Sequence, residues 1–153
     1  MFALLAVLLV VPTPHFWAAP GWHVGSSPPR ACVGVPAGSC VWSAGWASTA
    51  RYRDCSNCVP PHHTLMQLPP GGIVIQLTQV RERPDRAPVG TWPARIRADK
   101  ITAGFEGVSN RFGVFQTFIR TGHIERSLFV WFGRAHPTRR QLARANAELR
   151  TAR

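Results

Sequence analysis

The residues with the most distinctive chemistry in this chain are four cysteines, Cys32, Cys40, Cys55 and Cys58. An even number of cysteines in a small exported protein favours disulfides over free thiols. Four cysteines can pair in three ways, and the sequence leaves all three open. Bonds that cross between the first and the second pair would close longer loops and stabilise the fold more than bonds within each pair. We expect two disulfides that stabilise the domain.

Cys55 and Cys58 also allow a different interpretation, a metal-binding or redox protein. With Cys32 and Cys40, or with His62 and His63, they would supply four ligands of the kind that tetrahedral zinc prefers. A redox dithiol would need a lowered thiol pKa, which the N-terminus of a helix commonly provides. The neighbouring residues, rich in proline and polar side chains, predict a loop instead. Zinc is therefore the alternative cofactor, and the first expectation is no cofactor.

Positive charge dominates the ionisable residues. Seventeen arginines and one lysine stand against seven carboxylates, for a net charge of +11. Codon bias in a GC-rich genome would also give many arginines and almost no lysine. The competing interpretation is therefore that the charge reflects codon usage and has no anionic partner. If the charge has a function, we expect a monomer whose partner is an anionic cell-envelope surface or polymer rather than nucleic acid. The candidate anion-binding residues are Arg139, Arg140, Arg144 and Arg150.

No sequence motif indicates catalysis. The chain lacks the Gly-x-Ser-x-Gly turn of serine hydrolases, a glycine-rich phosphate loop and the His-Glu-x-x-His zinc motif. Its carboxylates show no spacing that marks a catalytic pair, although Glu106, between Phe105 and Gly107, is expected to be partly buried. We therefore name no catalytic residue and expect a non-enzymatic protein.

The N-terminal residues 1–11 form an unbroken apolar run that ends at Pro12. This length fits the core of a secretory signal, whereas a membrane-spanning helix needs about 20 apolar residues. One element of a signal is missing, because no basic residue precedes Arg30. We interpret residues 1–19 as a signal peptide or an N-terminal membrane anchor, and expect a secreted or cell-envelope-associated protein.

The remainder of the chain is long enough for one domain. Residues 20–37 are rich in proline, glycine and serine, which is typical of a linker. We therefore expect a single domain over residues 38–153.

Alternating apolar residues predict the strands of this domain. The clearest pattern covers residues 73–80, with one face in the core and the face that carries Gln76 largely in water. Residues 124–133 are apolar on both faces, which predicts a strand in the middle of a sheet. Further strands are expected over residues 40–47 and 114–120.

A helix is expected at the end of the chain, over residues 139–151. Thr138 and Gln141 have the spacing of a capping box at its start. Its narrow apolar stripe, with Leu142 and Leu149, favours packing on a sheet over insertion into a membrane. The expected fold class is α+β, an antiparallel β-sheet packed by a C-terminal α-helix, and the alternative is a β-sandwich with a terminal helix.

Overall fold

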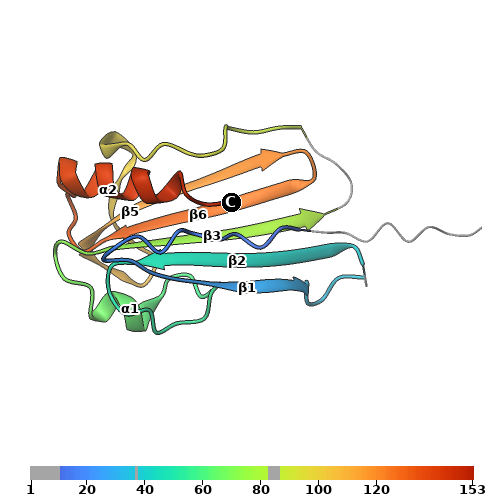
Figure 1. Ribbon diagram of the computed structural model, residues 1–153, viewed down its shortest axis with the longest axis horizontal. Helices are drawn as coiled ribbons and strands as arrows, with labels where there is room; N and C mark the ends of the chain where they lie inside the picture. The colour runs from blue at the N-terminus through green and yellow to red at the C-terminus, as the bar shows by residue number, and fades with distance from the viewer. Residues whose placement is uncertain (1–10, 37, 83–86) are drawn as a thin grey trace, which may run out of the picture.

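The computed structural model describes residues 11–36, 38–82 and 87–153. Its central element is a six-stranded antiparallel sheet with the order β1-β2-β3-β6-β5-β4 (Figure 1). The strands are β1 (His23–Ala31), β2 (Cys40–Ser48), β3 (Ile73–Glu82), β4 (Thr102–Phe105), β5 (Val108–Thr121) and β6 (Ile124–Phe132). The helices are α1 (His62–Met66), α2 (Arg139–Leu149) and a short 3-10 helix, Ala98–Lys100.

This architecture confirms the expected α+β fold with a C-terminal helix on an antiparallel sheet. The alternative β-sandwich is wrong, because the described strands form one sheet, and helices and connecting segments cover its faces in place of a second sheet. β6 lies between β3 and β5 in the interior of the sheet, as its two apolar faces predict.

We call the side of the sheet that contacts α2 the helix face. The register places Ile75 of β3 opposite Val130 of β6, and Val130 opposite Phe115 of β5. Ala145 and Leu149 of α2 pack on this cluster and have no exposed surface. Burial of a leucine side chain contributes about 1.5–3 kcal/mol, so this contact holds α2 on the sheet.

Hydrogen bonds cap the first turn of α2 and tie the helix to a neighbouring segment. Thr138 and Gln141 form the predicted capping box, in which each side chain accepts from the backbone N–H of the other residue. Asn146 accepts from the Ile96 N–H (2.8 Å) and donates to the Ile96 carbonyl (3.0 Å). The second pair of bonds ties α2 to the segment 93–99.

The N-terminal segment 11–22 also lies on the helix face, beside α2 (Figure 1). His15 and Arg153 exchange two backbone hydrogen bonds of 3.0 Å. The Trp17 N–H donates to the Thr151 hydroxyl oxygen (3.0 Å). The N-terminal segment and the residues that follow α2 therefore hold each other on the sheet.

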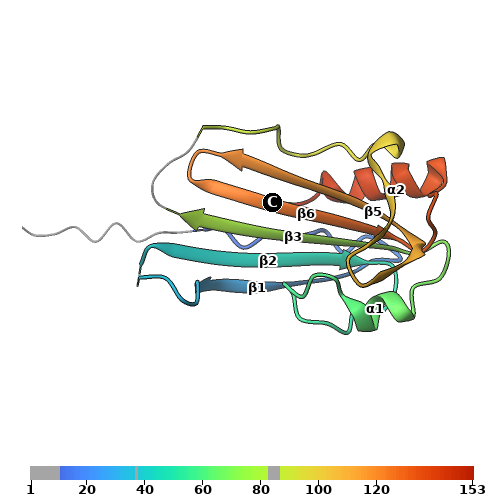
Figure 2. The ribbon, with the colours of Figure 1, turned by 180° about the vertical axis from the view of Figure 1, so that it is seen from behind.

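We call the opposite side of the sheet the loop face. Val74, Trp131 and Val114 lie opposite one another on the three central strands. They pack with Leu65 of α1 and with Leu68, all at most 3 % exposed. Figure 2 shows α1 near the end of the sheet where β6 leads into α2, so the 49–72 connection covers this end of the loop face.

Several local features differ from the sequence expectations. The segment 20–37, expected as a linker, contains β1, an edge strand in which the register shifts beside Pro28 and Pro29. An edge strand tolerates proline at such a place because no further strand needs the missing N–H. The sequence does not predict β4 or α1, which are too short for a periodic pattern. Of the apolar N-terminal run, residues 1–10 lie outside the described residues.

Candidate functional site

The four cysteines form two local disulfides, Cys32–Cys40 and Cys55–Cys58. The first joins Cys32, directly after β1, to Cys40, the first residue of β2, and the second closes a loop between β2 and α1. Two disulfides are thus confirmed, and the pairing is the one with short loops. No cysteine among the described residues is free. Disulfides persist in oxidising compartments, which indicates an environment outside the cytosol.

The Cys55–Cys58 disulfide removes the thiolates that the alternative zinc site would need. His63 is held by the Asp54 carboxylate, with 3.0 Å between Nδ1 and Oδ1, while His62 lines a separate small hollow. Within residues 11–36, 38–82 and 87–153, no group of three or more His, Cys, Asp or Glu side chains could hold a metal ion. The structure therefore does not bring Cys55, Cys58, His62 and His63 together as a metal site.

A buried polar network lies between the Cys55–Cys58 loop and the sheet. Gln76, only 1 % exposed, accepts a hydrogen bond from Trp131 Nε1 (2.8 Å). Its Nε2 donates to the Tyr52 hydroxyl (3.0 Å) and to the Cys58 carbonyl (2.6 Å). Tyr52 donates in turn to the Cys55 carbonyl (2.9 Å). Burial raises the pKa of the Tyr52 phenol well above its usual value. The expectation that the Gln76 side of β3 lies largely in water is wrong at this residue.

Asp54 fixes the first turn of α1. Its carboxylate accepts from the Thr64 hydroxyl (2.6 Å), the Thr64 N–H (2.8 Å) and the His63 N–H (3.2 Å). Burial acts to raise the pKa of the Asp54 carboxyl, but the hydrogen bonds from Thr64 and His63 outweigh it, and the pKa is lowered. Since a short helix leaves its first N–H groups without internal partners, this role of Asp54 is structural.

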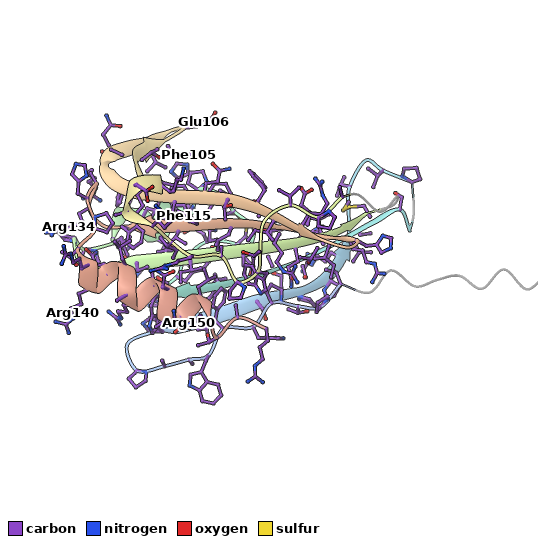
Figure 3. The ribbon with its side chains drawn as sticks, turned by 90° about the horizontal axis from the view of Figure 1, so that it is seen from above. Phe105, Glu106, Phe115, Arg134, Arg140 and Arg150 are labelled. Carbon is purple, nitrogen blue, oxygen red and sulfur yellow. A yellow bond between two sulfur atoms is a disulfide. The ribbon has the colours of Figure 1, made fainter. Side chains whose placement is uncertain are left out.

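Glu106 is exposed in the turn between β4 and β5 (Figure 3), so its expected partial burial is wrong. The preceding Phe105 points into the loop-face core and meets Phe129 and Trp131 edge-on, at centroid distances of 5.6 and 5.8 Å. With Phe105 turned inward, the turn directs Glu106 to solvent.

Among the described residues, seven exposed arginines line the hollows beside α2, and we call this group the α2 arginine surface. Four of them are the predicted anion-binding candidates, and three come from segments that flank the helix. Figure 3 shows Arg134 and Arg140 at one end of α2 and Arg150 at the other. The members are Arg95, Arg97, Arg134, Arg139, Arg140, Arg144 and Arg150.

Most of these side chains lack an acidic partner. Arg97 binds Asp99 through two hydrogen bonds of 2.9 and 3.1 Å. Arg144 donates to the Gly21 carbonyl (3.1 Å), and its guanidinium carbon lies 5.1 Å from the ring centroid of Trp22. The side chains of the other five make no hydrogen bond or ion pair with any residue that the structure describes. The positive charge around α2 is therefore largely uncompensated.

Hollows flank α2 on two sides. We call the first, of about 390 Å³, the arginine hollow, and the second, of about 500 Å³, the α2 groove. The arginine hollow is lined by Gly71, Arg134, Thr138, Arg140, Gln141 and Arg144. The α2 groove is lined by Pro93, Ala94, Arg95, Ala143, Asn146 and Arg150.

No family model, curated protein or solved structure matches this chain. Among the described residues, no helix is long and apolar enough to cross a membrane.

The structure divides the four predicted arginines between the two sides of α2. Arg140 and Arg144 lie four residues apart, share a side of the helix and line the arginine hollow. Arg139 and Arg150 lie on the other side, with Arg150 in the α2 groove. Arg134 was not among the candidates, because it follows β6 and reaches the hollow only through the fold. Helical spacing in the sequence could have placed Arg140 and Arg144 on one side of the helix and Arg139 and Arg150 on the other.

Proposed function

We propose that this domain is a non-enzymatic protein that docks on an anionic lipid surface of the cell envelope through the α2 arginine surface. The observation that supports this most directly is the group of five exposed arginines without an acidic partner in the described part of the chain. Each basic side chain near an anionic bilayer contributes about 1 kcal/mol of attraction. The helix itself is held on the sheet by Ala145 and Leu149, so Arg139 and Arg140 are free to face a partner.

An exposed tryptophan next to this surface favours a bilayer over a soluble polymer. Trp17 is 73 % exposed, and its backbone N–H donates to the hydroxyl of Thr151, two residues beyond the end of α2. Tryptophan concentrates at the boundary between lipid headgroups and hydrocarbon, because its indole ring is apolar and the indole N–H can remain hydrated. Trp17 would enter this boundary while the arginines contact the headgroups.

The proposal includes export, with residues 1–19 acting as a signal peptide or an N-terminal anchor. Export would deliver the chain to a compartment in which Cys32–Cys40 and Cys55–Cys58 remain oxidised. It would also deliver the α2 arginine surface to the outer side of a membrane.

Cosedimentation with vesicles tests the docking. We expect the protein to bind equimolar vesicles of phosphatidylglycerol and phosphatidylcholine, and not vesicles of phosphatidylcholine alone. The binding should weaken as salt is added, because salt screens exposed charges. Equal binding to both vesicle types would contradict the proposal, and binding to heparin without binding to vesicles would replace the bilayer by an anionic polymer.

A charge-matched pair of triple variants separates the surface from net charge. The test variant carries Arg139→Gln, Arg140→Gln and Arg150→Gln, all on α2 or directly after it. The control carries Arg30→Gln, Arg51→Gln and Arg53→Gln, all exposed and far from α2 in the chain. We expect the test variant to bind the mixed vesicles on the order of a hundredfold more weakly, from about 1 kcal/mol per arginine. An equal loss in the control would show that only net charge matters.

A further inference from the structure

We propose that the arginine hollow binds a dianionic phosphate group, the form present in a phosphate monoester at neutral pH. This inference rests on the proposed function, because it names the headgroup chemistry that the α2 arginine surface would select. The shared ligand chemistry can come from a lipid headgroup or from a soluble phosphate, and the experiment below distinguishes them.

The side chains that line the hollow suit this charge. Arg134, Arg140 and Arg144 line it together, and no carboxylate is among its described lining residues. A guanidinium presents its N–H groups in a planar fork that matches two oxygens of a phosphate. Because three positive charges around one hollow repel each other, a dianion offsets more of this repulsion than a monoanion does.

The backbone beneath the hollow is held in place by buried contacts. Gln141, 7 % exposed, donates from Nε2 to the Pro70 carbonyl (3.0 Å). The Gly133 N–H donates to the Gly72 carbonyl (3.0 Å), and a side chain at position 133 would collide with the Pro69 carbonyl. These contacts fix the backbone just before Arg134 relative to the first turn of α2. Less ordering is then needed when an anion binds.

Arg144 is already oriented by its neighbours. One of its terminal nitrogens donates to the Gly21 carbonyl (3.1 Å), and the group lies over the Trp22 ring. Gly21 has φ +81°, and a Cβ there would lie 2.7 Å from that nitrogen, so glycine permits this approach. A guanidinium has five N–H donors, and the remaining ones are available to a ligand.

The volume also suits a phosphate with part of the group that carries it. At about 390 Å³, the hollow falls in the range of small-molecule sites, about 300–1,000 Å³. A phosphate on three arginines would leave room for a glycerol or sugar carbon chain at the open side.

Calorimetric titration of the full chain with two small probes tests the charge preference. Glycerol phosphate is a monoester and largely dianionic at neutral pH, whereas dimethyl phosphate is a monoanionic diester. We expect glycerol phosphate to bind at least about tenfold more tightly, the factor that one additional charge-assisted hydrogen bond implies. Equal binding of the two probes would overturn the inference.

Two matched lysine variants test the guanidinium geometry. Arg140→Lys keeps the charge and removes the fork from the hollow, and Arg139→Lys makes the same change on the other side of α2. Both side chains are exposed and make no hydrogen bond with another described residue, so both variants should fold. We expect Arg140→Lys to weaken glycerol phosphate binding about tenfold and Arg139→Lys to leave it unchanged. If the two variants behave alike, the hollow is not the site.

Binding to vesicles then shows whether the phosphate belongs to a lipid or to a soluble molecule. It also distinguishes failure of the docking proposal from failure of the phosphate proposal. Tighter binding to phosphatidic acid than to phosphatidylglycerol vesicles of equal charge would identify a lipid monoester as the ligand. Binding of glycerol phosphate by a protein that binds neither vesicle would keep the hollow as a site for soluble phosphates and overturn the docking proposal. Binding to both vesicles alike, with no preference between the two small probes, would keep the docking proposal and overturn this inference.

Discussion

Replacing Gln76 by leucine removes the centre of the polar network under the Cys55–Cys58 loop. The wild-type side chain accepts one hydrogen bond from Trp131 and donates two, to Tyr52 and to the Cys58 carbonyl. Leucine has a similar volume but none of these polar atoms. Since Trp131 is fully buried, its indole N–H would remain without an acceptor and without access to water.

The cost follows from the groups left without partners. One buried donor without an acceptor costs about 1–3 kcal/mol, and loss of the donor to the Cys58 carbonyl adds to this. We therefore expect Gln76→Leu to lower the free energy of unfolding by about 2–4 kcal/mol. For a chain of this size, the corresponding decrease in Tm is about 5–15 °C. Urea unfolding of the oxidised protein, followed by tryptophan fluorescence, measures the free energy, and thermal unfolding measures Tm.

Two further variants make the measurement specific. Gln116→Leu is the same substitution at an exposed position on the loop face, and should change stability by less than about 0.5 kcal/mol. Adding Trp131→Phe to Gln76→Leu removes the donor together with its acceptor, so the double variant should lose less than the sum of the single losses. Strict additivity, or a Gln76→Leu protein as stable as wild type, would refute the role assigned to the network.

Three other measurements test two further polar groups and the two disulfides of the fold. Tyr52 is the only tyrosine of the chain, so an ultraviolet pH titration reports its phenol alone, and it should ionise above the usual pKa of about 10. Because the folded state keeps this proton more tightly than the unfolded state, stability should fall as pH rises above about 10, and a normal midpoint in the folded protein would contradict the burial argument. Because the pKa of Asp54 is lowered in the folded state, its carboxylate contributes stability above about pH 4, and this is lost as pH falls through the folded-state pKa. Asp54→Asn should therefore reduce the loss of stability between neutral and acidic pH. An unchanged loss in the variant would contradict the role of Asp54. The two disulfides join residues 8 and 3 positions apart in the sequence. From the entropy of closing these loops, replacing both cysteines by serine should lower the free energy of unfolding in urea by about 2.5 kcal/mol for Cys32–Cys40 and by about 1.6 kcal/mol for Cys55–Cys58. The reverse order would mean that loop entropy does not dominate.

The sheet and α2 could be predicted because their signals are local. Residues 73–80 alternate with the period of a strand, and residues 124–133 are apolar on both faces, so their places follow from a few neighbouring side chains. The capping box at Thr138 is also local, because its two side chains lie three residues apart. The burial of Gln76 could not be predicted in this way. It depends on the 49–72 connection folding back over the loop face, and neither α1 nor this connection has a periodic pattern.

The candidate site divides in the same way. Arg140 and Arg144 are placed together by helical spacing, whereas Arg134 joins them in the arginine hollow from the end of β6. Arg95 reaches the α2 groove, on the other side of the helix, from the segment tied to Asn146. The sequence indicates that the last third is basic. It does not show that three arginines line one hollow, because the contacts that bring them there join residues up to 123 positions apart, as between Arg144 and Gly21.

The two faces of the sheet carry different kinds of polar chemistry, and this makes the experiments independent. On the loop face, Gln76 and Asp54 are buried or partly buried, and their hydrogen bonds end on other groups of the fold. On the helix face, the exposed side chains of Arg139 and Arg140 end in solvent. Gln76→Leu should therefore leave glycerol phosphate binding unchanged at temperatures where the variant remains folded. Arg140→Lys should in turn leave the urea midpoint unchanged, because Arg140 contributes no contact to the core. If either variant altered both stability in urea and binding of glycerol phosphate, the two faces of the sheet would be energetically coupled. The arginine hollow would then contribute to the stability of the fold as well as to binding.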